Sequence, residues 1–238
     1  MTTGFTVEHV FSIGSILSRT FSTLSGKPGV FFGLAAISMV PTFFVGLMDP
    51  TWVVLGFVGS CIDIIITLLI QGAMAYATYQ VLSGDDEVTI GETVSAAMPH
   101  LLPLLGVAIL TGIGISIGTL LLIIPGIILR CIWAVSVQAC IVEDLGVLDS
   151  ISRSAELTKY YRLQIFVLMF LVGILIVIFA TLDVVLSIDG PSAGLSLISA
   201  ALQTLPTAFS GVMSAIIYYD LRAVKEGLDL DHLVKIFD

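Results

Sequence analysis

The sequence has few charged residues for its length. Only 11% of its 238 residues are charged, whereas 57% are hydrophobic, and the mean hydropathy is +1.10. Soluble domains carry about a quarter charged residues, so this chain has too little polar surface for a water-soluble globule, and we expect a lipid bilayer as its solvent. Basic residues are the scarcer kind, 9 against 18 acidic ones. The resulting net charge of −9 argues against nucleic acid as a partner.

The sequence also lacks the patterns of a metal or catalytic site. Its three cysteines, Cys61, Cys131 and Cys140, lie in apolar runs without metal-ligand spacing, and we interpret them as small core residues. The three histidines have no second ligand at metal spacing, and no Ser-His-Asp or Cys-His pattern is apparent. We therefore expect no metal, no cofactor and no catalytic residues. The N-terminal segment lacks a basic region, an apolar core and a cleavage site, which predicts no cleaved signal peptide.

Long apolar runs dominate what is present. Six of them are long enough for transmembrane helices, at about residues 30–48, 52–79, 104–123, 127–142, 163–187 and 193–219. Apolar residues at helical spacing predict interfacial amphipathic helices over 10–24 and 147–161. A capping box at Thr89 starts a third, short helix that Pro103 should end. The expected fold is all-α: a single membrane domain, residues 1–238, with six transmembrane helices and two or three interfacial helices.

The basic residues predict how this bundle lies in the membrane. If the spans alternate, eight of the nine basic residues fall on one side, and the opposite loops, near Asp49, Ile124 and Asp189, contain none. The exception is Arg130, which lies within a span. The six tyrosines lie at span ends on that same side, as in an interfacial aromatic belt. The positive-inside rule then places both termini in the cytoplasm. The residues expected at the cytoplasmic interface are Arg153, Lys159, Arg162 and Arg222.

Three ionisable side chains, Asp63, Arg130 and Asp183, lie within the expected spans, and Gln71 and Gln138 complete a candidate intramembrane polar cluster. A lone charge in lipid costs at least about 2.5–3.5 kcal/mol, so these groups should face the bundle interior, pair or reach the interface. One interpretation is a cluster that lines a path for a substrate or an ion. The other is structural, with Arg130 paired to Asp183 and Asp63 protonated or hydrogen-bonded.

Small residues and prolines mark the third and fourth spans. The pair Gly114-xxx-Gly118 predicts close helix packing within one bundle, with a dimer face as the alternative. Pro125-Gly126 predicts the turn between the two spans. Glu143-Asp144 follows the fourth span, and we interpret this carboxylate pair as a solvated helix end.

Residues 121–159, LLIIPGIILRCIWAVSVQACIVEDLGVLDSISRSAELTK, carry a resemblance to a known family. Further matching segments are Ile13–Leu17 with Phe21, and Tyr219–Arg222 with Glu226-Gly227. Together they resemble a group of bacterial membrane proteins that includes the membrane domain attached to some glycerophosphoryl diester phosphodiesterases. The resemblance implies a six-helix bacterial inner-membrane protein. In fused members the phosphodiesterase chemistry belongs to a separate soluble domain, so we do not carry that activity over. The matching features of the segment are Pro125-Gly126, Arg130, Trp133, Glu143, Gly146, Arg153-Ser154 and Leu157-Thr158.

Three functional hypotheses follow. The first is a non-enzymatic polytopic inner-membrane protein, an accessory or scaffold subunit or a membrane-organising protein, with the lipid bilayer and another membrane protein as partners. The alternative is a small transporter or channel that uses the intramembrane Asp/Arg cluster. A third, an enzyme acting on lipids, would need a polar pocket at the interface near Glu143.

Overall fold

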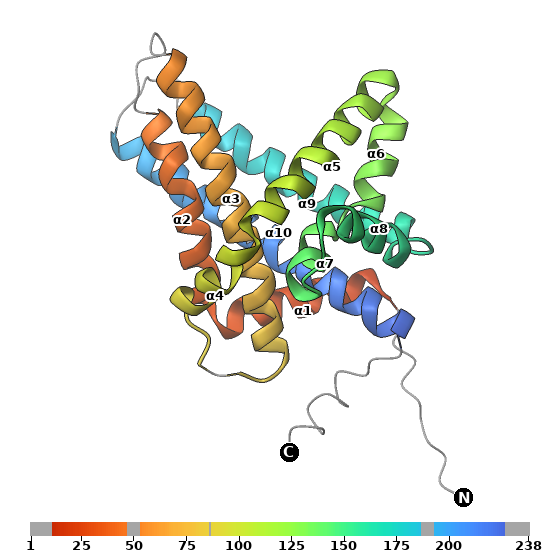
Figure 1. Ribbon diagram of the computed structural model, residues 1–238. Helices are drawn as coiled ribbons and strands as arrows, with labels where there is room; N and C mark the ends of the chain where they lie inside the picture. Colours follow the sequence, from red (N-terminus) through yellow and green to blue (C-terminus); the bar gives the residue numbers. More distant parts are fainter. Residues whose placement is uncertain (1–10, 47–52, 86, 187–192, 227–238) are drawn as a thin grey trace, which may run out of the picture.

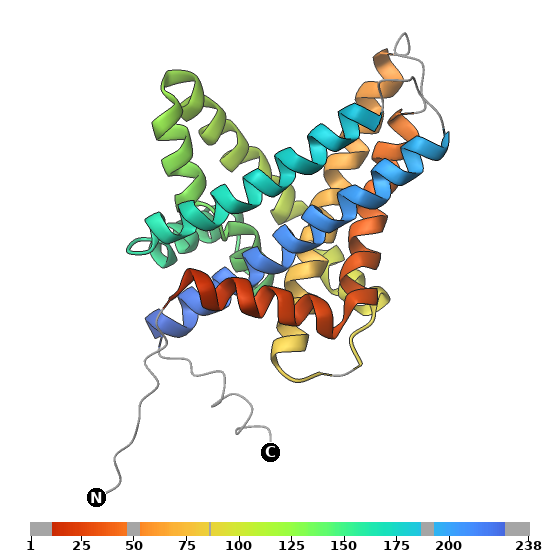
Figure 2. The same cartoon turned by 180° about the vertical axis from the view of Figure 1, so that it is seen from behind.

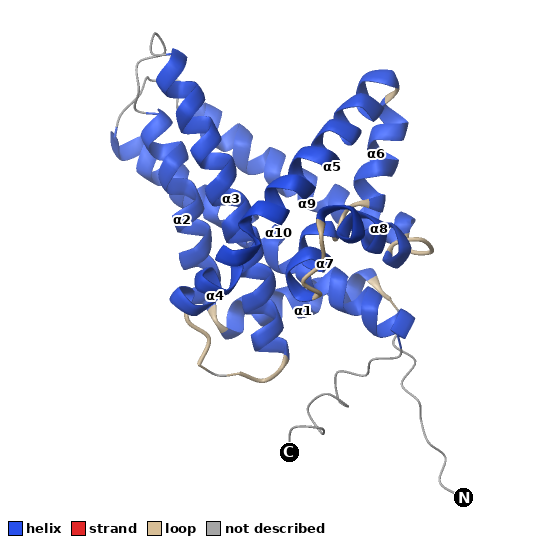
Figure 3. Cartoon of the chain, in the orientation of Figure 1, coloured by secondary structure: helices blue, strands red, loops and turns tan. Residues whose placement is uncertain are grey.

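The computed structural model describes residues 11–46, 53–85, 87–186 and 193–226, and the regular structure in these ranges is entirely helical (Figure 1, Figure 3). A 3₁₀ turn, η1, covers Met98–His100. The helices are α1 Ile13–Gly26, α2 Pro28–Gly46, α3 Val53–Leu82, α4 Ile90–Ala97, α5 Leu101–Leu121, α6 Ile123–Ile132, α7 Ser136–Val142, α8 Val147–Leu157, α9 Arg162–Leu186 and α10 Ala193–Glu226.

Five helical segments are long and apolar enough to cross a membrane: Val54–Leu82, Ile90–Leu121, Ile123–Val142, Arg162–Leu186 and Ala200–Glu226. A sixth is counted if α1 and the first part of α2 are taken together, although these two helices meet at a bend of 93°. The predicted all-α architecture is confirmed, and of the six predicted spans the structure supports five, or six if the bent pair is counted as one span. Each segment predicted as a span or an interfacial helix coincides with one or two of the helices.

The helices form two arms on a common base (Figure 1, and from behind Figure 2). The first arm contains α2 and α3 with the end of α9 and the start of α10, and the second is the hairpin of α5 and α6. The base contains α1, α4, α7, α8 and the end of α10. Fully buried apolar side chains, among them Phe31, Met74 and Ile216, belong to one core. Large apolar side chains near the hairpin turn, such as Leu120 and Ile124, are exposed, as expected of a surface that faces lipid.

Two prolines lie in places other than those predicted. Pro103 does not end a helix, because α4 ends at Ala97 and Pro103 lies in the first turn of α5. Pro125 and Gly126 do not form the turn between spans, because α6 already begins at Ile123. Proline is tolerated in a first turn, where a backbone N–H has no helical partner.

Gly126 instead lets α5 and α6 pack closely. A β-carbon at this position would lie 2.8 Å from the Cα of Thr119 on α5, and one at Gly118 would lie 3.2 Å from the Cα of Gly126. A β-carbon at Gly114 would lie 2.6 Å from two ring carbons of Trp133. These small residues therefore lie at contacts within the chain, which is the arrangement that the packing interpretation predicts.

The fourth predicted span is not one continuous helix, because residues 133–135 separate α6 from α7. Hydroxyl groups of α8 and of Thr158, the residue that follows it, bond the backbone groups at this break. Ser154 Oγ donates to the carbonyl oxygen of Ile132 at 2.9 Å and accepts from the N–H of Val135 at 3.3 Å. Thr158 Oγ1 lies 3.1 Å from the same carbonyl oxygen. Both side chains are fully buried, so α8 supplies the partners that a continuous helix would have supplied itself.

Candidate functional site

A cavity of about 330 Å³ lies between the first arm and the broken α6–α7 segment. Its volume is at the lower end of the range typical of small-molecule sites. Much of the wall is apolar, including Ile70, Met74 and Val172. Eight side chains of its wall are polar, and they come from five helices: Ser38 of α2, Thr67 and Gln71 of α3, Arg130 of α6, Gln138 of α7, and Thr207, Ser210 and Ser214 of α10.

Four of the five hydroxyl groups of this wall bond to their own helices. Ser210 Oγ donates to the carbonyl oxygen of Thr207 at 3.0 Å, and Ser214 Oγ donates to that of Gly211 at 2.9 Å. Ser38 and Thr207 donate in the same way, to Ala35 and Gln203. A hydroxyl that donates to its helix keeps lone pairs as acceptors. These four hydroxyl groups can therefore still accept hydrogen bonds from a group in the cavity.

Gln138 differs from these hydroxyls because only half of its amide is bonded. Its Nε2 donates to Ser214 Oγ at 2.8 Å, which joins α7 to α10. Its Oε1 is buried and has no hydrogen-bond partner among the described residues, and only 4% of the residue is exposed. A buried acceptor without a donor is costly, and this oxygen has almost no accessible surface, so a donor could reach it only if the side chain moved.

Arg130 is the only charged side chain in the cavity wall that the structure describes. It is the eighth residue of the segment Ile123–Val142, about 10 Å from the start of that segment at 1.5 Å per residue and hence near its middle. Arg130 is an exposed residue. No described carboxylate forms an ion pair with it. The cavity thus has a positive charge at membrane depth.

The predicted pair between Arg130 and Asp183 is wrong, since no ion pair joins these two described residues. The reason lies in the two arms: α6 belongs to the second, whereas α9 runs to the tip of the first (Figure 1). Asp183 follows Ile176, the last cavity residue of α9, by seven residues, or about 10 Å. Asp63 precedes the first α3 residue of the wall, Thr67, by one helical turn. Both carboxylates have interactions of their own, and the cluster predicted from the sequence is therefore only partly brought together.

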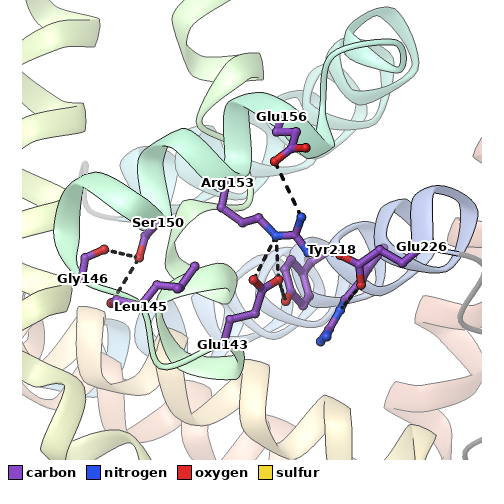
Figure 4. Close-up of polar contacts among 9 residues, drawn as sticks. Glu143, Leu145, Gly146, Ser150, Arg153, Glu156, Tyr218 and Glu226 are labelled. Carbon is purple, nitrogen blue, oxygen red and sulfur yellow. Dashed lines mark hydrogen bonds and ion pairs between the residues drawn. The ribbon is translucent and has the colours of Figure 1, made fainter.

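A second group of polar residues lies in the base, where α7, α8 and α10 meet (Figure 4). Arg153 Nε lies 2.9 Å from both carboxylate oxygens of Glu143. Tyr218 Oη donates to Glu143 Oε1 at 2.6 Å. Arg153 also pairs with Glu226, whose second oxygen accepts from Arg222 Nε at 2.7 Å. We call these five residues, Glu143, Arg153, Tyr218, Arg222 and Glu226, the base network.

The base network lies one helical turn beyond the cavity. Gln138–Ser214 and Glu143–Tyr218 are successive side-chain bonds to α10, four residues apart on that helix. Burial disfavours the charged form of Arg153, but its hydrogen bonds to Glu226 and Glu143 outweigh this effect and hold the pKa of the guanidinium above its usual value. These bonds join α7, α8 and α10 beside the cavity.

Glu143 corrects the expectation of a solvated carboxylate pair. Only 15% of its side chain is exposed, whereas the neighbouring Asp144 is largely exposed and lies 3.1 Å from His100 Nε2. Asp144 has a φ of 50°, a left-handed conformation that aspartate tolerates at a helix end. The chain therefore reverses direction at Asp144 and leaves Glu143 directed toward α8 and α10.

The remaining residues predicted at the interface have separate roles. Lys159 and Lys225 lie 5.7 and 5.5 Å from the centroid of the Tyr160 ring. Arg162 begins α9, and its buried Nε has no hydrogen-bond partner among the described residues. These side chains form no single site with Arg153 and Arg222.

Sequence reasoning missed the hydroxyl residues of the cavity and Tyr218. A usable signal was present in the spacing: Thr207, Ser210 and Ser214 follow one another at i, i+3 and i+7, and Thr67 and Gln71 at i and i+4. Such spacing places polar groups on one face of an otherwise apolar helix.

No known protein family, curated protein or solved structure matches this chain. The family resemblance of residues 121–159 therefore stays a prediction. The structure does bring several residues of that resemblance together, because Glu143 and Arg153 belong to the base network and Ser154 and Thr158 bond the helix break.

Proposed function

We propose that this chain is a small transporter that binds a polar solute in the cavity between the first arm and the α6–α7 segment. The observation that carries the proposal is the convergence of eight polar side chains, from five helices, on one cavity within apolar segments. Polar groups inside a membrane are costly, and where they face a cavity they typically mark a path for a solute.

The broken α6–α7 segment supports the same proposal. Discontinuous helices are a recurring feature of transporter binding sites, because irregular backbone at membrane depth is tolerated only beside protein or a water-filled cavity. Here the break at residues 133–135 lies between two polar residues of the cavity wall, Arg130 and Gln138. In this proposal the solute is bound by Arg130, Gln71, Gln138 and the hydroxyl residues of the wall. Asp63 and Asp183 do not bind it.

We further propose a bacterial inner membrane as the location, with the base and both termini on the cytoplasmic side. The orientation is supported by the positive-inside rule, and the bacterial origin by the family resemblance alone. In this orientation α1 and α8 lie at the cytoplasmic interface, and the turn between α5 and α6 lies on the opposite side.

The proposal is tested by asking whether water-soluble reagents reach the cavity. Ser210→Cys is introduced into a chain carrying Cys61→Ala, in which Cys131 and Cys140 are buried. The protein is reconstituted in vesicles and treated with a membrane-impermeant methanethiosulfonate from each side. We expect Cys at position 210 to react from at least one side. Protection from both sides, equal to that of Cys131 and Cys140, would show a dry cavity and refute the proposal.

Two matched controls make this result interpretable. Ser152→Cys on α8 is exposed in the base and should react readily. Ser116→Cys on α5 is exposed on the apolar second arm, where lipid should exclude the reagent. If reagents reach the cavity, flux of candidate solutes into the same vesicles would then show transport. Gln138→Leu should reduce that flux.

The accessory or scaffold hypothesis remains a second candidate. It is favoured by exposed apolar side chains on the amphipathic helices, Phe21 of α1 at 61% and Leu148 of α8 at 70%. Crosslinking in native membranes from positions 21 and 148 should capture a defined protein partner if this hypothesis is right, and lipid alone if it is wrong.

A further inference from the structure

We propose that the cavity selects anionic solutes and that Arg130 is the residue that binds their negative charge. This inference rests on the proposed function, because it assumes that a solute enters the cavity. It adds the chemical class of that solute, which the size and polarity of the cavity alone do not give.

The polar side chains of the wall carry a net positive charge. Seven of the eight polar side chains are neutral hydroxyls or amides, and the eighth is Arg130. No Asp or Glu is among the described residues of the wall. A cation entering this space would meet one positive charge and no carboxylate, whereas an anion would meet a guanidinium group.

Arg130 differs from the arginines that form ion pairs. Arg19 pairs with Asp220, Arg153 with Glu143 and Glu226, and Arg222 with Glu226. All three lie in the base, and each is paired with a carboxylate of this chain. Arg130 lies near the middle of an apolar segment and has no such pair among the described residues. A lone charge at this depth is unfavourable, so an anion beside it would lower the free energy of the protein.

The guanidinium group of Arg130 suits a small oxyanion. A guanidinium group binds carboxylates and phosphates through two parallel N–H bonds. At about 330 Å³ the cavity fits a small carboxylate or phosphate, or the headgroup of an anionic lipid, but not an acyl chain as well.

The test measures charge selectivity at the cavity with two reagents of opposite charge. Ser210→Cys, in the Cys61→Ala chain, is reconstituted in vesicles of phosphatidylcholine alone, which have no net surface charge. Its reaction rates with the sulfonatoethyl (anionic) and trimethylammonioethyl (cationic) methanethiosulfonates are divided by the rates of 2-mercaptoethanol with the same reagents. We expect the anionic reagent to be favoured at least about tenfold, as a nearby positive charge in a poorly screened site requires.

Three variants assign the selectivity to Arg130. Arg130→Gln should abolish the preference and Arg130→Lys should retain it, because the charge is lost in one and kept in the other. Arg162→Gln is the matched control, since Arg162 does not belong to the cavity wall, and it should leave the preference unchanged. Continued protection of Cys131 and Cys140 in each variant reports that the fold is intact.

A second arm of the experiment separates the two sources of the anion. In vesicles that contain phosphatidylglycerol, the preference is compared with that of Ser152→Cys, which reports the effect of the negative surface on both reagents. A lipid headgroup that occupies the cavity would compete with the anionic reagent and lower the preference at position 210 more than at position 152. An equal change at both positions would instead assign the site to small soluble anions. Either result supports an anion site.

The two proposals fail in different ways. If the anionic reagent has no advantage over the cationic one, or the advantage survives Arg130→Gln, the cavity is open to water but not selective, and only the present inference is overturned. If neither reagent reacts, the cavity is closed to water, and the proposed function and this inference are overturned together.

Discussion

Ser154 of α8 donates a 2.9 Å hydrogen bond to the carbonyl oxygen of Ile132, the last residue of α6. The same hydroxyl accepts from the N–H of Val135, so one side chain bonds both edges of the helix break. The break in turn separates Arg130 from Gln138 on the cavity wall. A residue outside the cavity therefore determines the path of the backbone that lines it.

Ser154→Ala should lower the stability of the protein by about 1–3 kcal/mol, because it removes partners from buried backbone groups. Because Thr158 still reaches the carbonyl oxygen of Ile132, we expect a loss toward the lower end of this range. Thermal unfolding in detergent measures the change. Ser152→Ala, on the exposed face of the same helix, should stay within about 0.5 kcal/mol, and an equal effect of both variants would contradict the role of Ser154.

The two adjacent tyrosines of α10 should respond differently to loss of their hydroxyl groups. Tyr218→Phe removes the 2.6 Å bond to Glu143 and leaves a largely buried carboxylate with one donor fewer, so we expect a loss of about 1–2 kcal/mol. The hydroxyl of Tyr219 is buried and has no hydrogen-bond partner among the described residues, so Tyr219→Phe should be neutral or stabilising. Unfolding of the two variants side by side checks the prediction, which fails if their order is reversed.

Truncation of Glu143 should disturb the base more than truncation of Glu156. Glu143→Ala leaves the guanidinium of Arg153 with Glu226 as its close partner and Tyr218 without an acceptor, and we expect a cost of about 2–3 kcal/mol. Glu156 is exposed and lies 3.8 Å from Arg153, so Glu156→Ala should cost less than about 1 kcal/mol. Similar unfolding temperatures for the two variants would show that the base network does not stabilise the fold.

Two glycines of the second arm offer a comparable pair. Gly126→Ala would place a β-carbon 2.8 Å from the Cα of Thr119, so α5 and α6 must move apart, at about 1–3 kcal/mol. Gly112→Ala meets nothing within 4 Å and should be neutral or stabilising through its higher helix propensity. Pairs of cysteines across the α5–α6 contact, tested for crosslinking, would report the separation directly, and unchanged crosslinking in Gly126→Ala would refute it.

The sequence alone predicts the helices well because hydropathy and helical periodicity are local properties. The segments of α3 and α9 are apolar over most of their length, and the amphipathic pattern of 147–161 is a repeat of neighbouring residues. The break between α6 and α7 is different, because the hydroxyls that bond it come from residues 19 to 26 positions further along the chain. No pattern within 127–142 contains that information.

The site was predicted only in part for a related reason. Position along a span gives the depth of Arg130 and Asp183 but not the arm to which each helix belongs, so the expected pair was wrong. Gln71 and Gln138 do lie with Arg130 in one wall. The charge of Glu143 was visible in the sequence, but its partners Arg153 and Tyr218 come from two other helices, and burial of a carboxylate depends on such partners.

The bonds of Ser154 and Thr158 also set an order for biosynthesis. Residues 123–142 emerge from the ribosome before α8, so the carbonyl oxygen of Ile132 and the N–H of Val135 have at first no hydroxyl to bond them. In lipid these groups would be satisfied by a continuous helix. The segment is therefore expected to insert unbroken and to bend only when α8 arrives, which makes the wall of the cavity one of the last parts of the protein to acquire its final shape.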